Sequence, residues 1–209
     1  DVEEKEQKRY PKPPFTTSTL QQVAFNKLGY SSARTMRIAQ QLYEGLEIGQ
    51  EGPVGLITYM RTDSVRVANE ALGAVRGLIA ERFGKSSLPQ EPRAYKSRKR
   101  AQEAHEAVRP ANVARAPELL KPFLNDEQFA LYQLIWQRFV ASQMVDAVDR
   151  VTAVSIQAGT YQLKANGRTP AVAGWTAVYA ADEEEKPQDD DAAPEGVLPP
   201  LAKGDVLEL

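Results

Sequence analysis

Apolar residues recur at helical spacing in the first third of the chain. One such stretch runs from Leu20 to Leu28, follows the capping-box sequence Ser18-Thr19-Leu20-Gln21 and stops at Gly29. A second starts near Ser31 or Ser32 and keeps its apolar stripe to Leu46. This spacing predicts two amphipathic helices.

Two longer helices are predicted further along. The residues after Asp63 and Ser64, both good N-caps, keep the helical period as far as Phe83. Another helix is expected from Asn125 or Asp126 to about Met144. A short β-type run, Leu56–Tyr59, precedes the first of these two helices.

The pattern changes to strand character at about Asp146, where β-branched residues become frequent. The predicted strands are 148–156, 161–164, 172–179 and the end of the chain from 198, with turns at Ala158-Gly159 and Asn166-Gly167.

We therefore expect an α+β fold in which a helical domain, residues 16–145, is joined to an antiparallel β-rich domain, residues 146–209. A chain of 209 residues can bury one good core or two modest ones. The acidic stretch near 182–196 is too charged to pack, and we expect a disordered loop there. The chain starts inside a charged segment and stops within a strand pattern, so we expect a piece of a longer protein.

The net charge of −2 conceals a basic remainder, because residues 182–191 hold seven acids and one lysine. The rest of the chain carries a net charge of +4, and residues 93–100 hold five basic residues and no acid. Such a cluster attracts phosphate backbones, although a solvated loop is the plain alternative. There is no cysteine, no signal peptide and no apolar run that could span a bilayer, so we expect a cytoplasmic protein.

Tyr59 and Arg61 fall where the β-type run is expected to meet a helix N-terminus. Two residues apart on an extended segment, they can lie on the same side of the chain. A phenol beside a permanent cation, near free backbone N–H groups, is typical of a phosphate-handling site. A free tyrosine has a pKa of about 10, so it needs a neighbouring cation or base to act as a nucleophile.

Three separated motifs resemble type IA DNA topoisomerases of the bacterial topoisomerase I kind. They are Pro14-Phe15-Thr16-Thr17-Ser18-Thr19-Leu20-Gln21, Gly55-Leu56-Ile57-Thr58-Tyr59-Met60-Arg61-Thr62-Asp63-Ser64 and Ala101-Gln102-Glu103-Ala104-His105-Glu106-Ala107-Val108-Arg109-Pro110. The resemblance covers nearly all of the chain but only the middle of such an enzyme. It implies a partial arch of a toroidal fold, with residues 1–15 as the returning segment of the β domain.

The resemblance also implies roles for four residues. Tyr59 would attack a DNA phosphodiester and form a 5′-phosphotyrosyl link, while Arg61 would hold the scissile phosphate. His105, the lone histidine, would lie near the tyrosine and either contact the phosphate as imidazolium or relay a proton as neutral imidazole. Asp63 would orient His105 or cap the following helix. Glu103, Glu106 and Arg109 are expected only to position this motif.

Further nucleic-acid contacts are expected from the hydroxyls of Thr16 and Ser18, although helix capping explains Ser18 equally well. Tyr95 could stack on a base, as aromatic residues do in single-strand sites. The basic segment would contribute Arg93, Lys96, Arg98, Lys99 and Arg100.

Such an enzyme relaxes negatively supercoiled DNA and uses Mg²⁺ that is held on a separate domain. The acidic run Asp189–Asp191 is not expected to bind Mg²⁺ here, because no predicted strand would hold its carboxylates in place. We therefore expect no metal site in this chain and no relaxation of DNA by it alone. We expect the partner to be DNA, preferably single-stranded. We expect the protein to be a bacterial monomer that associates with the nucleoid and makes no contact with a membrane. The alternatives are a non-catalytic single-stranded nucleic-acid-binding module and a helical interaction scaffold.

Overall fold

The computed structural model describes residues 1–96, 105–179 and 196–206. The chain forms two compact units, one of Asp1–Tyr10 with Asp146–Leu209 and one of Pro11–Val145. The predicted contacts Arg98, Lys99 and Arg100, together with most of the acidic stretch 182–196, lie outside the described residues. No helix in the described ranges is long and apolar enough to cross a membrane.

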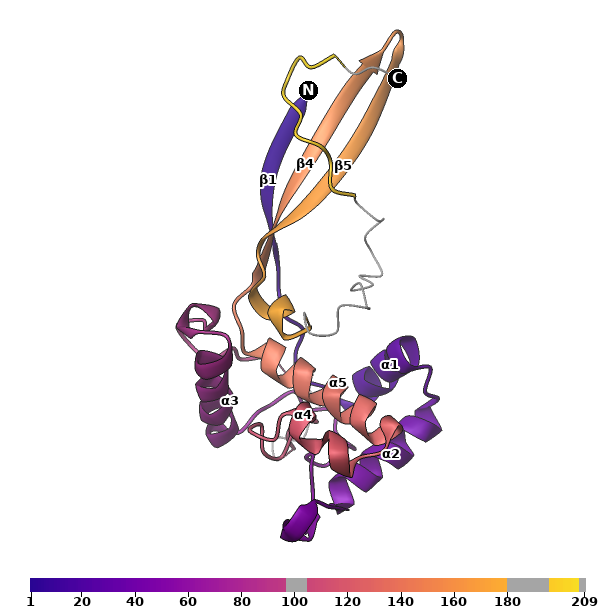
Figure 1. Cartoon of the computed structure of the whole chain (residues 1–209), viewed down its shortest axis with the longest axis vertical. Helices are drawn as coiled ribbons and strands as arrows, with labels where there is room; N and C mark the ends of the chain where they lie inside the picture. The colour runs from indigo at the N-terminus through magenta and orange to yellow at the C-terminus, as the bar shows by residue number, and fades with distance from the viewer. Residues whose placement is uncertain (97–104, 180–195, 207–209) are drawn as a thin grey trace. The chain divides into compact units, whose positions relative to one another are not determined.

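The unit Pro11–Val145 is helical, and its longest helix, α5, supplies more buried residues than any other helix of the unit. Helices α1 and α2 pack beside α5 (Figure 1). The α-helices are α1 (Thr17–Leu28), α2 (Ser32–Glu44), α3 (Asn69–Arg82), α4 (Pro117–Leu120) and α5 (Asp126–Ser142). Between them lie the short strands β2 (Leu46–Glu47) and β3 (Pro53–Val54) and the 3₁₀ turns η1 (Gly49–Glu51), η2 (Lys85–Ser87) and η3 (Lys121–Phe123).

The predicted ends of these helices are confirmed where a side chain or a glycine sets them. Ser31 caps α2, Asn125 caps α5 in a capping box with Gln128, and Gly29 ends α1 with a φ of 66°. Two predicted starts are wrong. The capping box of α1 joins Thr16 to Thr19 and does not involve Ser18 with Gln21.

The other wrong start is that of α3, which begins at Asn69 and is not capped by Asp63 or Ser64. The intervening residues make contacts with other parts of the chain that hold them out of the helix, as described below. The predicted strand Leu56–Tyr59 is also wrong, because only Ile57 forms a ladder bridge, to Pro110.

The second unit holds an antiparallel sheet of β1 (Val2–Arg9), β4 (Ala147–Ala158) and β5 (Tyr161–Val172), with β4 in the middle (Figure 1). In the register, Val2 lies opposite Val154, and Ala158 opposite Tyr161 across the predicted turn. A buried Asp149 carboxylate, 2% exposed, forms an ion pair with Arg9: Arg9 Nη2 donates to Oδ1 at 3.2 Å, and Arg9 Nε lies 2.7 Å from Oδ2. Arg168 lies 3.7 Å from the same carboxylate.

Three β predictions are corrected by the structure. Asn166 and Gly167 stay in the ladder, opposite Ala153 and Thr152, and Leu198 packs so closely over Gly167 that its Cγ would lie 2.7 Å from an added Cβ. Residues 172–179 turn into the 3₁₀ helix η4 (Gly174–Tyr179), and the Trp175 indole donates to the Arg9 carbonyl at 2.9 Å. Residues 198–206 form no strand.

Candidate active site

The three sequence motifs meet in the helical unit. The segment around Val108 lies between the other two: the Val108 N–H donates to the Phe15 carbonyl at 2.8 Å, and the Thr58 N–H donates to the Arg109 carbonyl at 2.9 Å. The Thr58 hydroxyl reinforces this junction by donating to the Ala107 carbonyl at 2.7 Å. Segments that are far apart in sequence therefore form one hydrogen-bonded framework.

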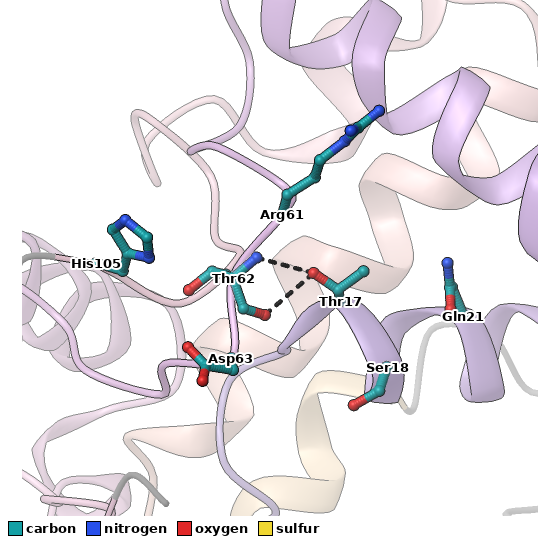
Figure 2. A pocket seen from close by; sticks show the side chains of 7 residues that line it. All are labelled: Thr17, Ser18, Gln21, Arg61, Thr62, Asp63 and His105. Atoms are coloured by element: carbon teal, nitrogen blue, oxygen red, sulfur yellow. Dashed lines mark hydrogen bonds between the residues drawn. The ribbon is translucent and has the colours of Figure 1, made fainter. Parts of the chain in front are cut away.

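Thr17 fastens the first motif to the second through both its backbone and its side chain. Its N–H donates to the Thr62 carbonyl at 2.8 Å, and its hydroxyl donates to the Met60 carbonyl at 2.7 Å. The same hydroxyl accepts the Thr62 N–H at 2.8 Å. A threonine at the start of a helix thus takes the place of a neighbouring strand for the residues after Tyr59 (Figure 2).

Solvent exposure of the side chains alternates along residues 59–64. Alternate side chains anchor the segment in the core and the others reach solvent, as expected for extended backbone. The anchors are Met60, Thr62 and Ser64, and the exposed side chains are Tyr59, Arg61 and Asp63.

A pocket of about 500 Å³ opens beside Arg61. It is lined by Thr17, Ser18, Gln21, Arg61, Thr62, Asp63 and His105 (Figure 2). The side chains of Arg61 and Asp63 diverge in this view, and no ion pair joins them. Within the described residues, the Arg61 guanidinium has no carboxylate partner, so its charge is available to a bound anion.

The N-terminus of α1 adds a second anion-attracting feature to the pocket. Its first turn carries no acidic residue. The N–H groups of Thr17, Thr19 and Leu20 donate to Thr62 and Thr16, whereas that of Ser18 has no acceptor among the described residues. A free amide at a helix N-terminus favours negative charge. The helix end expected beside Arg61 is thus that of α1 and not that of α3.

His105 and Asp63 line the same pocket, but no hydrogen bond joins them in the described part of the chain. Glu106 stabilises the N-terminus of α3, because its carboxylate accepts a hydrogen bond from the Ala68 N–H at 2.6 Å. The other oxygen of Glu106 accepts from Arg109 at 2.6 Å. Glu106 and Arg109 therefore hold the His105 segment against the start of α3.

Tyr59 precedes the pocket residues and lies outside the set that lines it. Its ring is 47% exposed and meets the ring of Tyr43 edge-on, with centroids 5.3 Å apart and an interplanar angle of 63°. Among the described residues, no group hydrogen bonds to the Tyr59 hydroxyl. The hydroxyl is thus free to meet a substrate atom.

The predicted nucleic-acid contacts have different placements. Thr16 is occupied by capping α1, whereas Ser18 lines the pocket. Arg93 is half-buried and donates to the Met144 carbonyl at 2.7 Å, and the Tyr95 hydroxyl donates to the Ser142 carbonyl at 2.8 Å. These two residues anchor the basic segment to the end of α5, and Lys96 beside them is exposed.

Two residues near the site were not predicted from the sequence to belong to it. Gln21 lines the pocket because it lies one helical turn after Ser18, a spacing that the sequence does contain. Tyr43 contacts Tyr59 only through tertiary packing, for which the sequence carries no local signal. Over the described ranges, no group of three His, Cys, Asp or Glu side chains could hold a metal ion.

Known proteins resemble this chain in sequence over nearly its whole length. A protein-family model described as DNA topoisomerase matches residues 1–209. DNA topoisomerase 1 of Xylella fastidiosa (strain Temecula1 / ATCC 700964) is 50% identical over 193 residues, covering 91% of this chain and 24% of that protein. DNA topoisomerase 1 of Rickettsia felis is 45% identical over 210 residues, covering 99% of this chain and 26% of that protein.

A solved structure of full-length topoisomerase I from Thermotoga maritima is similar in fold. It matches with a TM-score of 0.79 and 37% identity, covering 98% of this chain and 31% of that chain. The chain spans about a quarter of the length of the curated relatives that it matches. On the match to the whole chain and on these identities, the chain belongs to the DNA topoisomerase family, among the type IA enzymes of the bacterial topoisomerase I kind.

Proposed function

We propose that this chain supplies the nucleophilic half of a DNA cleavage site, within an enzyme that relaxes negatively supercoiled DNA by transient single-strand breakage. The observation that carries the proposal is the free Tyr59 hydroxyl on a segment that places Arg61 in a pocket with His105 and the N-terminus of α1. A nucleophile next to an anion-binding pocket is the arrangement that phosphodiester cleavage needs.

In the proposed reaction, the Tyr59 phenol oxygen bonds to the scissile phosphorus while the bond from phosphorus to the 3′ oxygen breaks. The phenol proton leaves to a base or to solvent, and the departing 3′ oxygen takes up one proton. The 5′-phosphotyrosyl ester keeps the free energy of the broken bond. Religation runs the same steps in reverse, so no nucleotide cofactor is consumed.

The pocket residues would bind and stabilise the phosphate. Arg61 offers a planar, permanently charged group that can donate two hydrogen bonds to phosphoryl oxygens. The amide and the hydroxyl of Ser18 would add neutral donors. His105 would either contact the phosphate or carry a proton.

Mg²⁺ is expected in the complete enzyme, bound outside this chain. The described residues include no group of three His, Cys, Asp or Glu side chains that could hold it. Strand passage would require the unit that carries Tyr59 to swing away from the rest of the enzyme, with the β-rich unit as part of the arch. We place the enzyme in the bacterial cytoplasm, as a monomer acting on single-stranded regions of DNA.

The test uses a full-length enzyme, because the chain matches only part of its relatives. This chain would replace the matching segment of the Xylella fastidiosa topoisomerase, to which it is 50% identical. The chimaera and its Tyr59→Phe variant would be mixed with a labelled single-stranded oligonucleotide and Mg²⁺, then denatured rapidly. Tyr161→Phe, at a tyrosine that is 74% exposed on β5, is the matched control.

We expect a labelled protein adduct with the chimaera and with Tyr161→Phe, and none with Tyr59→Phe. Equal adduct in all three proteins would place the nucleophile elsewhere. Binding without adduct in any of them would favour the non-catalytic binding module. Arg61→Ala should lower the cleavage rate far more than the affinity for DNA, because Arg61 would act mainly on the charge that develops during cleavage.

A further inference from the structure

The orientation of the Tyr59 ring requires a physical cause. The ring is half-exposed and its hydroxyl has no hydrogen-bond partner in the described part of the chain, so its hydroxyl alone does not fix it. A reacting group must be held within about 0.5 Å of its productive position. The ring of Tyr43, whose centroid lies 5.3 Å from that of Tyr59, is the aromatic contact that can supply this restraint.

Tyr43 itself stands on a fixed support. It is the penultimate residue of α2, and the Leu56 N–H donates to the carbonyl of the preceding residue, Leu42, at 2.7 Å. The Tyr43 carbonyl faces Gly55 so closely that a Cβ there would lie 2.8 Å from its oxygen. The end of α2 is therefore fastened to the segment that leads into Tyr59.

The far side of α2 is fastened as well. Leu42 is fully buried, and the Gln41 side chain accepts a hydrogen bond from Gln128 of α5 at 3.1 Å. A change at the Tyr43 ring, which is 40% exposed, can therefore be made without disturbing these anchors.

We propose that Tyr43 is a positioning residue for Tyr59: its ring holds the ring of the nucleophile edge-on, so that the phenol oxygen is presented to the phosphate in one orientation. This assignment rests on the proposed function of Tyr59. Tyr43 acts through its ring and not through its hydroxyl. Edge-to-face pairs contribute enough stabilisation to change a rate about two- to twelvefold.

The experiment compares Tyr43→Phe, which keeps the ring, with Tyr43→Leu, which keeps an apolar side chain without the ring. The control is Tyr161→Leu. In the full-length chimaera, the single-turnover rate of adduct formation and the affinity for the oligonucleotide are measured separately. We expect the rate to fall about two- to twelvefold for Tyr43→Leu and to stay within about twofold for Tyr43→Phe, with unchanged affinity in both.

Three results would overturn the assignment. They are an unchanged rate in Tyr43→Leu, an equal loss in Tyr43→Phe, and a loss of affinity that matches the loss of rate. In the 209-residue chain itself, the NMR signals of the Tyr59 ring should shift in Tyr43→Leu much more than in Tyr43→Phe. If the unmutated chimaera forms no adduct, the proposed function fails and the role of Tyr43 fails with it. If adduct forms but the NMR signals of the Tyr59 ring do not shift in Tyr43→Leu, only the proposed role of Tyr43 fails.

Discussion

Replacing Thr17 by valine removes one hydroxyl that contacts three backbone groups: the Met60 carbonyl, the Thr62 carbonyl and the Thr62 N–H. The Met60 carbonyl loses its donor, and the Thr62 N–H loses its acceptor. The Thr62 carbonyl keeps the Thr17 N–H, so it is not orphaned. Two lost hydrogen bonds at about 1 kcal/mol each predict that the helical unit loses about 2 kcal/mol of unfolding free energy. The half-buried position of Thr17 keeps the loss near this value, because water can reach part of the site.

The chain offers a separate fluorescent probe for each unit. Trp136 is 3% exposed in the helical unit, and Trp175 lies in the β-rich unit. In a Trp175→Phe background, urea unfolding followed by Trp136 fluorescence reports the helical unit alone, which avoids fitting two units as one transition. Thr17→Ser is the matched control, since it keeps the hydroxyl and loses less than about 0.8 kcal/mol of methyl burial. If Thr17→Val and Thr17→Ser unfold at the same urea concentration, the hydroxyl is not what fastens the two motifs.

Three further predictions use the same two probes. Glu106→Ala should lower the unfolding free energy of the helical unit by about 2 kcal/mol, because the Arg109 guanidinium, 12% exposed, loses its carboxylate partner and the Ala68 N–H loses its acceptor. The control Glu118→Ala removes a 65% exposed carboxylate and should lower it by less than about 0.5 kcal/mol. Equal losses in the two variants would refute the role given to Glu106. Asp149→Asn should lower the unfolding free energy of the β-rich unit by about 3 kcal/mol, because Arg9 and Arg168 lose the negative charge that both contact. Trp175 fluorescence in a Trp136→Phe background would follow the unfolding, and an unchanged urea midpoint would contradict this prediction. Burial raises the pKa of Tyr132 above its ordinary value of 10.0, so folding disfavours the phenolate, and the stability present below that pH should be lost as the pH rises above it. Tyr132→Phe should flatten this loss above about pH 10, the ordinary pKa of tyrosine, and an unchanged slope there would assign the loss to other groups.

The helices were predictable wherever a local cause sets them. Asn125, Ser31 and Gly29 act on their own helix ends, so residue type and apolar spacing were sufficient there. The late start of α3 was not predictable, because Glu106, from a distant part of the chain, accepts the hydrogen bond that stabilises the N-terminus of α3. Asp63 and Ser64 are good caps by residue type, but the hydrogen bonds that Thr17 makes with Thr62 belong to an extended segment.

The β-rich unit shows the same limit for turn signals. Asn166-Gly167 is a strong hairpin sequence, yet the ladder with β4 continues through it and Leu198 fills the space above Gly167. For the site, the motifs identified Tyr59, Arg61 and His105, and the structure brings Arg61 and His105 to one pocket. The Tyr43 contact depends on how α2 ends against Gly55, which no local pattern encodes.

The framework between the motifs has a consequence for how such chains can vary in length. The Ala107 N–H donates to the Arg66 carbonyl at 2.9 Å, so the chain leaves the framework after Arg66, forms α3, and rejoins the framework at Ala107. Loop-closure entropy rises only slowly with length, by about 0.6 kcal/mol for each doubling. Insertions or deletions at exposed positions of this excursion, such as Glu91 and Pro92 between η2 and Arg93, should therefore be inherited with little penalty. Related chains are expected to differ in length there and to keep a constant count of residues between Phe15 and Thr17 and between Tyr59 and Arg66.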